Sequence, residues 1–173
     1  ADVESSRRIT LDDVFMQCSQ TKGFCGVSVA MLVESRNIDL DDPVSKYLPE
    51  FKELWVQKEE TNGVRKLVRA KNVLTLRHVL THTGGFPFQT RPSAFLGWTA
   101  SPLRVSAATA SASPLLFEPG TRSAYSNTGI DIAAAIVEVV THERWEAFLQ
   151  RRIFDPLEMH DTTFFPTREQ VSR

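Results

Sequence analysis

Three short stretches of this sequence contain residue types that could carry nucleophilic or acid–base chemistry. Ser19 and Lys22 stand three positions apart, Tyr125 and Asn127 stand two positions apart, and His82 precedes a pair of glycines. A serine beside an amine could form a nucleophile and its activator. A phenol or an imidazole could move protons. The rest of the sequence decides whether the fold could bring these groups together.

Ser19 and Lys22 have the spacing of one helical face. Residues three apart on a helix are neighbours, and a serine in the first turn lies at the positive end of the helix dipole. A partly desolvated lysine there could help to take the serine proton. The spacing alone favours a simpler interpretation, a helix-capping Ser19 and a surface Lys22. A Ser-x-x-Lys sequence arises by chance about once in a chain of this length.

Tyr125 and Asn127 follow a turn signal and precede an apolar helical pattern. A phenol beside an ammonium group ionises more easily and could act as a general base. The Asn127 amide could hold an acyl substrate and the lysine. On its own the stretch favours a packed loop tyrosine with Asn127 capping the next helix. Tyr47, the other tyrosine, is predicted to pack in the core.

The histidines are predicted to be structural. His82 ends a predicted helix, where an imidazole suits the negative end of the dipole. No arrangement of Asp and Ser around it is typical of a hydrolase triad, and the chain contains no G-x-S-x-G. The same interpretation applies to His78, His142 and His160.

The elements that must position these residues are predicted to be mostly helical. The first helix, about 19–34, is apolar on nearly every side and is therefore expected to be buried all round. Asn62-Gly63 predicts a hairpin with an exposed basic face. Residues 86–101 are predicted to form a loop. Further helices are expected at 43–48, from Thr75 to about 82, at 102–112, at 129–140 and from about 143 to 154.

Composition narrows the function classes. The chain has 173 residues, 42% of them hydrophobic, and a net charge of −1, so it can form a core and has no global attraction for nucleic acid. Its longest apolar run covers ten residues, 24–33, too few to span a bilayer. The two cysteines, Cys18 and Cys25, are expected to be small packing residues. No Cys/His spacing predicts a metal site, and no cofactor is expected.

Taken together, the motifs resemble the serine beta-lactamase-related enzymes. This family includes class C beta-lactamases, D-Ala-D-Ala carboxypeptidases, D-aminopeptidases and family VIII esterases. The resemblance runs from about residue 8 to residue 165 and is specific in combination. It is carried by the segments Cys18–Phe24 (S-x-T-K), Ile38–Pro49, Leu74–Gly85, Phe117–Gly120 with Tyr125–Gly129 (Y-x-N), and Ile153–Met159.

The resemblance implies a role for each motif residue. Ser19 would be the nucleophile that forms an acyl-enzyme, and Lys22 would activate it. Tyr125 would be the general base and later the acid, while Asn127 would hold the substrate and Lys22. The Ser19 backbone N–H would supply half of the oxyanion hole. Gln20, and Cys18 where the family usually has a small residue, are departures that leave the substrate open among esters, D-amino-acid peptides and beta-lactams.

The resemblance also implies parts that this sequence does not contain. The family has a third motif, K-T-G or H-x-G, downstream of Y-x-N, and nothing after Asn127 fits it. The letters H-x-G at His82 lie before Y-x-N and are interpreted as a decoy. Family members are longer, with sheet strands on both sides of this region.

We therefore expect 1–173 to be a single partial domain, the helical part of an α+β fold whose antiparallel sheet is largely missing. The nucleophile helix would cover about 19–34 and the helical domain about 40–165. The expected partner is a small-molecule acyl substrate, without nucleic acid or a membrane span. Association with the missing sheet portion, or self-association, is also expected. Two alternatives stay open, a non-catalytic binding module on the same scaffold and a site completed in trans by another chain.

Overall fold

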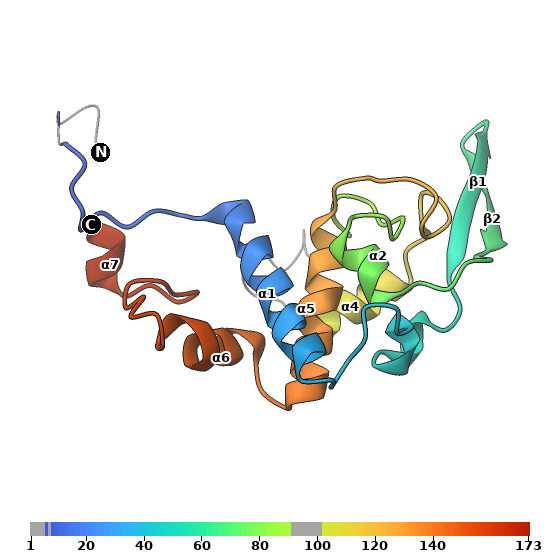
Figure 1. Ribbon diagram of the computed structural model, residues 1–173. Helices are drawn as coiled ribbons and strands as arrows, with labels where there is room; N and C mark the ends of the chain where they lie inside the picture. Colours follow the sequence, from blue (N-terminus) through green and yellow to red (C-terminus); the bar gives the residue numbers. More distant parts are fainter. Residues whose placement is uncertain (1–5, 7, 91–101) are drawn as a thin grey trace.

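The structure is a computed structural model that describes residues 6, 8–90 and 102–173. The predicted loop at 86–101 lies in part outside the described residues. Single-turn helices η1 (Cys18–Gln20), η2 (Val44–Lys46) and η3 (Pro49–Phe51) accompany the longer elements (Figure 1). Those elements are α1 (Thr21–Glu34), β1 (Trp55–Thr61), β2 (Val64–Arg69), α2 (Leu76–Leu80), α4 (Leu103–Ser111), α5 (Asn127–Thr141), α6 (Trp145–Leu149), the π-helical η4 (Gln150–Phe154) and α7 (Arg168–Ser172).

Helix α5 is the central element, with α1, α2 and α4 packed around it (Figure 1). Its consecutive residues Ile132 to Val137 are all buried. It begins at a cap in which the Ser126 hydroxyl accepts the Gly129 N–H at 3.3 Å. A Cβ added to Gly129 would lie only 2.8 Å from the Val79 carbonyl oxygen of α2. The absence of a side chain at Gly129 therefore lets α2 approach the first turn of α5 closely.

Helix α1 buries one face, and the prediction that it is buried all round is wrong. Cys25, Val29 and Leu32 are buried against the core, whereas Val27 is 48% exposed and Ala30 is also exposed. Apolar content alone predicted burial on every side. Among the described residues, α1 packs against α5 and also meets Trp145 of α6 and Phe154 of η4, and these contacts leave the side with Val27 and Ala30 exposed.

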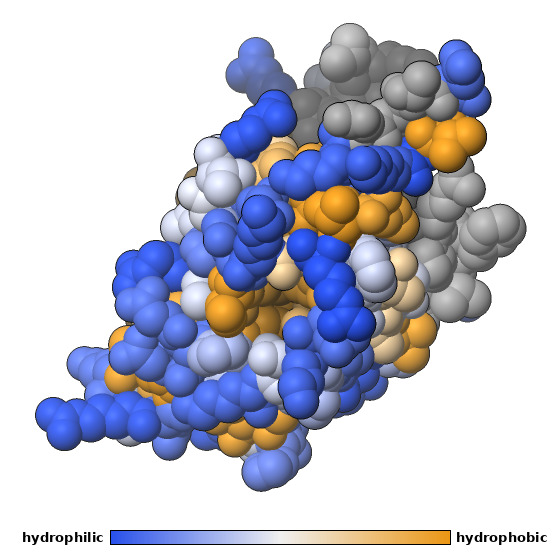
Figure 2. All heavy atoms as spheres, turned by 90° about the vertical axis from the view of Figure 1, so that its right-hand side faces the viewer, coloured by the Kyte–Doolittle hydropathy of each residue, from blue (hydrophilic) through white to orange (hydrophobic). Residues whose placement is uncertain are grey.

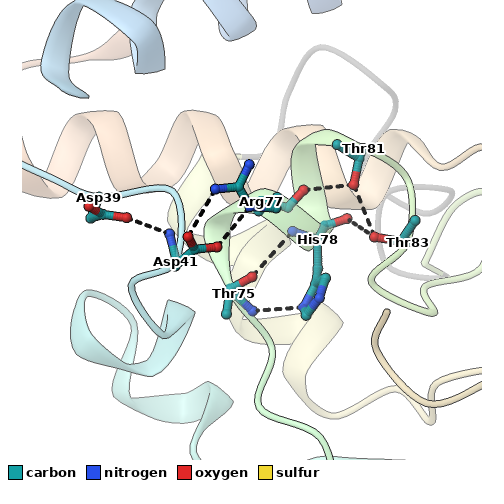
Figure 3. Close-up of polar contacts among 7 residues, drawn as sticks. All are labelled: Asp39, Asp41, Thr75, Arg77, His78, Thr81 and Thr83. Atoms are coloured by element: carbon teal, nitrogen blue, oxygen red, sulfur yellow. Dashed lines mark hydrogen bonds and ion pairs between the residues drawn. The ribbon is translucent and has the colours of Figure 1, made fainter. Parts of the chain in front are cut away.

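Helix α2 is fixed at its beginning by a capping box (Figure 3). The His78 N–H donates to the Thr75 hydroxyl, and the Thr75 N–H donates to His78 Nδ1 at 3.2 Å. Arg77 forms two hydrogen bonds to the Asp41 carboxylate, at 2.7 and 2.9 Å. The predicted start at Thr75 is confirmed, and His78 has the structural role that was expected. This anchored helix leads directly to His82.

The predicted hairpin at Asn62-Gly63 is confirmed. Strands β1 and β2 pair antiparallel, from Trp55 opposite Arg69 to Thr61 opposite Val64, with a bulge near Gln57. They extend from one end of the molecule (Figure 1). Figure 2 looks onto that end, where hydrophilic side chains frame apolar patches. The predicted basic residues are exposed, as expected, at Arg65, Lys66, Arg69 and Lys71.

Helices dominate the described residues, and β1–β2 is the only sheet found among them. Helices are therefore the main regular structure, as expected, although they account for 44% of the residues and not for most of them. The predicted helix near 143–154 is split into α6 and η4, and α7 lies beyond the predicted elements. No described helix is long and apolar enough to cross a membrane.

The two cysteines differ in their surroundings. Cys25 is fully buried in α1, as predicted for a packing residue, and burial raises its thiol pKa to about 12. Cys18 is exposed, so the prediction that it packs is wrong. Its position as the first residue of η1 accounts for this, because η1 has no buried residue and the buried residues of α1 begin at Cys25.

Candidate active site

Ser19, Lys22 and Tyr125 meet at the beginning of α1. The Tyr125 hydroxyl donates to Ser19 Oγ at 2.7 Å, and Lys22 Nζ donates to the same oxygen at 3.3 Å. Lys22 Nζ also lies 4.9 Å from the centre of the Tyr125 ring. Because 106 positions separate Ser19 from Tyr125, only the tertiary fold can bring these groups together.

A local backbone feature places Ser19 at the end of its helix. Cys18 has a φ of +48°, a left-handed conformation that is uncommon for a residue with a side chain. Cys18 is the first residue of η1, which contains Ser19 and leads directly into α1 at Thr21. Ser19 thus precedes the N-terminus of a 14-residue helix. Negative charge that develops on Ser19 would be favoured there by the helix dipole.

The position of Lys22 favours ionisation of Tyr125. Hydrogen bonds from Lys22 and with Ser19 lower the pKa of the Tyr125 phenol below its ordinary value. An ammonium group stabilises a phenolate more than a phenol, which is the physical cause of this direction. Tyr125 is 48% exposed, so the phenol is accessible to a substrate. The arrangement could therefore remove a proton from Ser19 and return it later.

Tyr125 is held by main-chain contacts between two loops. The N–H groups of Ala124 and Asn127 donate to the carbonyls of His82 and Phe88, both at 2.9 Å. The Ser126 hydroxyl donates to the Pro87 carbonyl at 2.7 Å. The loop that follows α2 therefore runs beside the loop that precedes α5 and fixes where Tyr125 lies.

Gly85 shows how closely these two loops approach. Its φ is +85°, and a Cβ added there would lie 2.3 Å from the Phe117 carbonyl oxygen. The Leu116 N–H donates to the Gly85 carbonyl at 2.7 Å. A side chain at Gly85 would clash with the main chain of the other loop, which explains the glycine in this segment.

Asn127 lies at the first position of α5, and its amide has no hydrogen-bond partner among the described residues. The structure does not bring it into a hydrogen bond with Lys22. The alternative prediction, that Asn127 caps the helix, is wrong because the cap is Ser126. Ser126 can accept from Gly129, three residues on, which is the usual geometry of a cap.

His82 and Phe88 are contacts of Tyr125 that were not predicted. The His82 ring centre lies 4.7 Å from that of Tyr125, and the Phe88 ring stacks on Tyr125 at 6.1 Å. His82 Nδ1 accepts the Ser126 N–H at 3.3 Å. The expectation that His82 is structural is compatible with these bonds, but its contact with the site was not expected. A histidine followed by Thr-Gly-Gly was the available signal, and it was interpreted as a helix end and as a decoy of the family's H-x-G motif.

Asp131 is an acidic group that the sequence analysis missed. It lies one turn after Asn127 on α5, and burial raises its pKa to about 6, while the charge of Lys22 partly opposes this shift. Asp131 in turn contributes to the raised pKa of Cys25. An Asp inside an otherwise apolar helical stretch was the signal in the sequence. The described residues contain no cluster of three or more His, Cys, Asp or Glu side chains placed to hold a metal ion.

The chain was compared with known families and proteins. A family profile described as "Beta-lactamase" matches residues 1–173. Lovastatin esterase from Penicillium rubens is 32% identical over 171 residues, which cover 93% of this chain and 42% of that protein. Esterase EstB from Burkholderia gladioli is 28% identical over 177 residues, which cover 95% of this chain and 42% of that protein.

A comparison with solved structures agrees with the sequence relatives. Unliganded simvastatin synthase (LovD) from Aspergillus terreus superposes with a TM-score of 0.78 at 25% identity, over all of this chain and 46% of that one. The chain thus spans less than half the length of these relatives. The resemblance inferred from the motifs is confirmed by both comparisons, and the chain belongs to the beta-lactamase family.

Proposed function

We propose that this chain carries the nucleophile and the proton-transfer groups of a serine hydrolase that works through an acyl-enzyme. The observation that carries the proposal is the hydrogen bond between Tyr125 and Ser19, with Lys22 within reach of both. A serine is a weak nucleophile until an adjacent base takes its proton. The lowered pKa of Tyr125 supports the phenolate as that base.

The proposed reaction has two halves. In the first, Ser19 Oγ attacks the acyl carbonyl, its proton passes to the Tyr125 phenolate, and the leaving group takes that proton as it departs. In the second, Tyr125 takes a proton from water, the resulting hydroxide attacks the acyl-enzyme, and the proton returns to Ser19 Oγ. Lys22 stabilises the phenolate in both halves. The Ser19 N–H is proposed to hold the oxyanion, and Asn127 to bind the substrate beside it.

The substrate is proposed to be a carboxylic ester. The names of two relatives, lovastatin esterase and esterase EstB, describe esterases and support this class. Two further classes, D-amino-acid peptides and beta-lactams, use the same acyl-enzyme chemistry. Rates on a p-nitrophenyl ester, a D-Ala-D-Ala peptide and a cephalosporin would rank the three, and we expect the ester to be hydrolysed fastest.

The nucleophile is tested with the Ser19→Ala variant of the whole protein. An acylating inhibitor such as a fluorophosphonate should add to the wild-type protein, and peptide mass spectrometry should locate the label on Ser19. Ser19→Ala should remove the label completely. Ser123→Ala is the matched control, because Ser123 is an exposed serine in the loop that leads to Tyr125. Labelling that persists in Ser19→Ala would contradict the proposal.

A second proposal concerns how the site is completed. The resemblance implies an antiparallel sheet, and the relatives are more than twice as long as this chain. We propose that such a sheet, from the rest of the whole protein or from another chain, supplies the second oxyanion donor. Residues 1–173 alone should then hydrolyse esters about 10²- to 10³-fold more slowly, the usual cost of one lost donor. Equal rates for residues 1–173 and the whole protein would refute this proposal.

Apolar side chains at the start of the described chain support association with such a sheet. Ile9, Leu11, Phe15 and Met16 are all mostly exposed. Exposed apolar groups of this size are typical of surfaces that another segment or chain covers. Sedimentation of residues 1–173 should show self-association, whereas the whole protein should bury this surface.

A further inference from the structure

His82 contacts the residues on both sides of Tyr125. Its carbonyl accepts the Ala124 N–H at 2.9 Å, and its Nδ1 accepts the Ser126 N–H at 3.3 Å. Between these two hydrogen bonds, the His82 ring packs on the Tyr125 ring with the centres 4.7 Å apart. One residue therefore holds the main chain before Tyr125, the main chain after it and the phenol ring itself.

The left-handed backbone of His82 makes this double contact possible. Its φ is +59°, directly after the end of α2. A residue in this conformation reverses the chain direction within one position, so the carbonyl and the side chain can both face the neighbouring loop. Side chains other than Asn, Asp and His adopt this conformation less readily. His82 combines a tolerated backbone conformation with a ring acceptor at Nδ1.

The hydrogen bond from Ser126 requires an uncharged imidazole. Nδ1 can accept an N–H only when the ring proton is on Nε2, because an imidazolium donates from both nitrogens. Partial burial and the positive charge of Lys22 lower the pKa of His82 below its ordinary value of 6.5. The described titratable groups that face the ring are Lys22 on α1 and Tyr125 on the adjoining loop. The charge of Lys22 disfavours the imidazolium, whereas the proposed Tyr125 phenolate would favour it.

We propose that His82 is a positioning residue that holds Tyr125 against Ser19 only while its imidazole is neutral. This inference rests on the proposed function, because the group that it positions is the proposed base. Protonation of His82 replaces the acceptor at Nδ1 with a donor, which faces the Ser126 N–H. It also places a second cation beside Lys22. Both changes weaken the hold on Tyr125, so acylation should fail in acid as His82 becomes charged.

The test compares the pH dependence of acylation in two variants at His82. His82→Asn keeps an acceptor near the position of Nδ1 and tolerates the left-handed backbone. His82→Phe keeps an aromatic ring against Tyr125 but has no acceptor. The measurement is the pre-steady-state release of p-nitrophenol from p-nitrophenyl acetate by the whole protein, between pH 4 and pH 9.

The wild-type acylation rate should fall on the acid side with the pKa of His82. His82→Asn should keep the acylation rate within about threefold of the wild-type rate at pH 7. Its rate should no longer fall in acid with the pKa of His82. His82→Phe should be slower by about 10- to 100-fold, the cost of a misplaced catalytic group. An unchanged acid decline in His82→Asn, or an unchanged rate in His82→Phe, would overturn the inference.

The chain supplies a matched control for the substitution. His142 also has a left-handed backbone, with a φ of +57°, and it lies at the far end of α5. His142→Asn makes the same chemical change in the same backbone conformation, away from Tyr125. It should leave both the rate and the pH profile unchanged. A change of the profile in His142→Asn would show that the effect is not specific to His82.

NMR separates failure of this inference from failure of the proposed function. If wild-type Ser19 is not acylated at all, the proposed function fails and the kinetic profile has no meaning. The Tyr125 ring signals in the Ser19→Ala variant should still shift with the titration of the His82 imidazole. Ring signals that do not follow His82 would overturn the positioning role whatever the chemistry of Ser19. The same measurement applies if His82→Phe does not fold.

Discussion

Both tyrosines of this chain lie beside a lysine, yet their surroundings prepare them for different chemistry. Lys46 Nζ lies 5.2 Å from the Tyr47 ring centre, and Lys22 Nζ lies 4.9 Å from the Tyr125 ring centre. The pKa of Tyr47 is raised, mainly by burial and by its hydrogen bond to Asp42, whereas the pKa of Tyr125 is lowered.

A carboxylate accounts for much of the difference. Asp42 accepts hydrogen bonds from Tyr47 and from Lys46, so an ionised acid neutralises that lysine and holds the phenol proton. At the other site the hydroxyl partner is the uncharged Ser19. The phenol at that site therefore keeps the full influence of Lys22.

The two acids beside these lysines also behave in opposite ways. Hydrogen bonds from Lys46 and Tyr47 lower the pKa of Asp42 to about 2, while burial raises the pKa of Asp131 to about 6. Asp42 bonds directly to Lys46 and Tyr47, whereas Asp131 interacts with Lys22 only through its charge, without a hydrogen bond among the described residues. The acid beside a Tyr–Lys contact thus helps to decide whether the phenol pKa is raised, as at Tyr47, or lowered, as at Tyr125.

The largest effect is expected when the hydroxyl of Tyr125 is removed. Tyr125→Phe keeps the ring against His82 and removes the hydroxyl that bonds to Ser19, so acylation by p-nitrophenyl acetate should fall about 10²- to 10⁴-fold. Tyr47→Phe is the matched control, and it should lower stability by about 1 kcal/mol without changing the acylation rate. Equal rates in Tyr125→Phe and the wild type would remove Tyr125 from the mechanism.

The next largest effect is expected when the charge of Lys22 is removed, with Lys46 as the comparison. Lys22→Met should raise the phenol pKa of Tyr125, because its first cause of lowering is the hydrogen bond from Lys22. Acylation at pH 7 should fall by about 10²-fold with it. Ultraviolet titration, with Tyr125→Phe as the reference, measures the pKa of the Tyr125 phenol. Lys46→Met is the control and should leave acylation unaltered; a matching loss there would mean that a general charge effect is responsible.

A smaller effect concerns Asp131 and can be measured as stability. The pKa of Asp131 in the folded protein, about 6, lies above the ordinary value of 3.8. The protonated carboxyl therefore adds to the free energy of unfolding below pH 3.8, and this stabilisation is lost as pH rises through 6. The free energy of unfolding of the wild type should therefore fall by about 2 to 3 kcal/mol between pH 4 and pH 7. This fall should be absent in Asp131→Asn. Urea unfolding across this range measures it. Parallel pH curves for variant and wild type would show that the carboxyl is not buried as described.

The smallest effect is expected at Asp42, and its sign is the reverse. The pKa of Asp42 in the folded protein, about 2, lies below the ordinary value of 3.8. The ionised carboxylate therefore adds to the free energy of unfolding above pH 3.8, and this stabilisation is lost as pH falls through 2. Asp42→Asn should cost about 1 kcal/mol at pH 7, a value typical of an accessible ion pair. It should also lower the pKa of Tyr47 toward that of Tyr125. A Tyr47 pKa that does not change in Asp42→Asn would assign the shift to burial alone.

Local pattern was enough to predict most elements. Thr75 as a cap, the Asn62-Gly63 turn and the helical period of α5 are encoded by neighbouring residues, and the structure confirms each of them. The resemblance also singled out Ser19, Lys22 and Tyr125, which the fold brings together. Their catalytic roles remain predictions until the variants are measured.

What sequence reasoning missed depends on contacts between distant segments. The exposed side of α1 at Val27 could not be foreseen, because hydropathy does not say which neighbours cover a helix. The contacts of His82 with Tyr125 and Ser126 depend on a left-handed backbone and on a loop more than 40 positions away. The raised pKa of Asp131 follows from burial, which the sequence around it does not determine.

The separation of Ser19 from Tyr125 in the sequence determines when the site can form during synthesis. The two partners are 106 positions apart, so during synthesis Ser19 leaves the ribosome well before its proposed base exists. Until the loops around His82 and Tyr125 have joined, Ser19 is an ordinary, unreactive alcohol. Under the proposed mechanism, labelling of Ser19 would then report completed folding, and a nascent or partly unfolded chain would not be acylated.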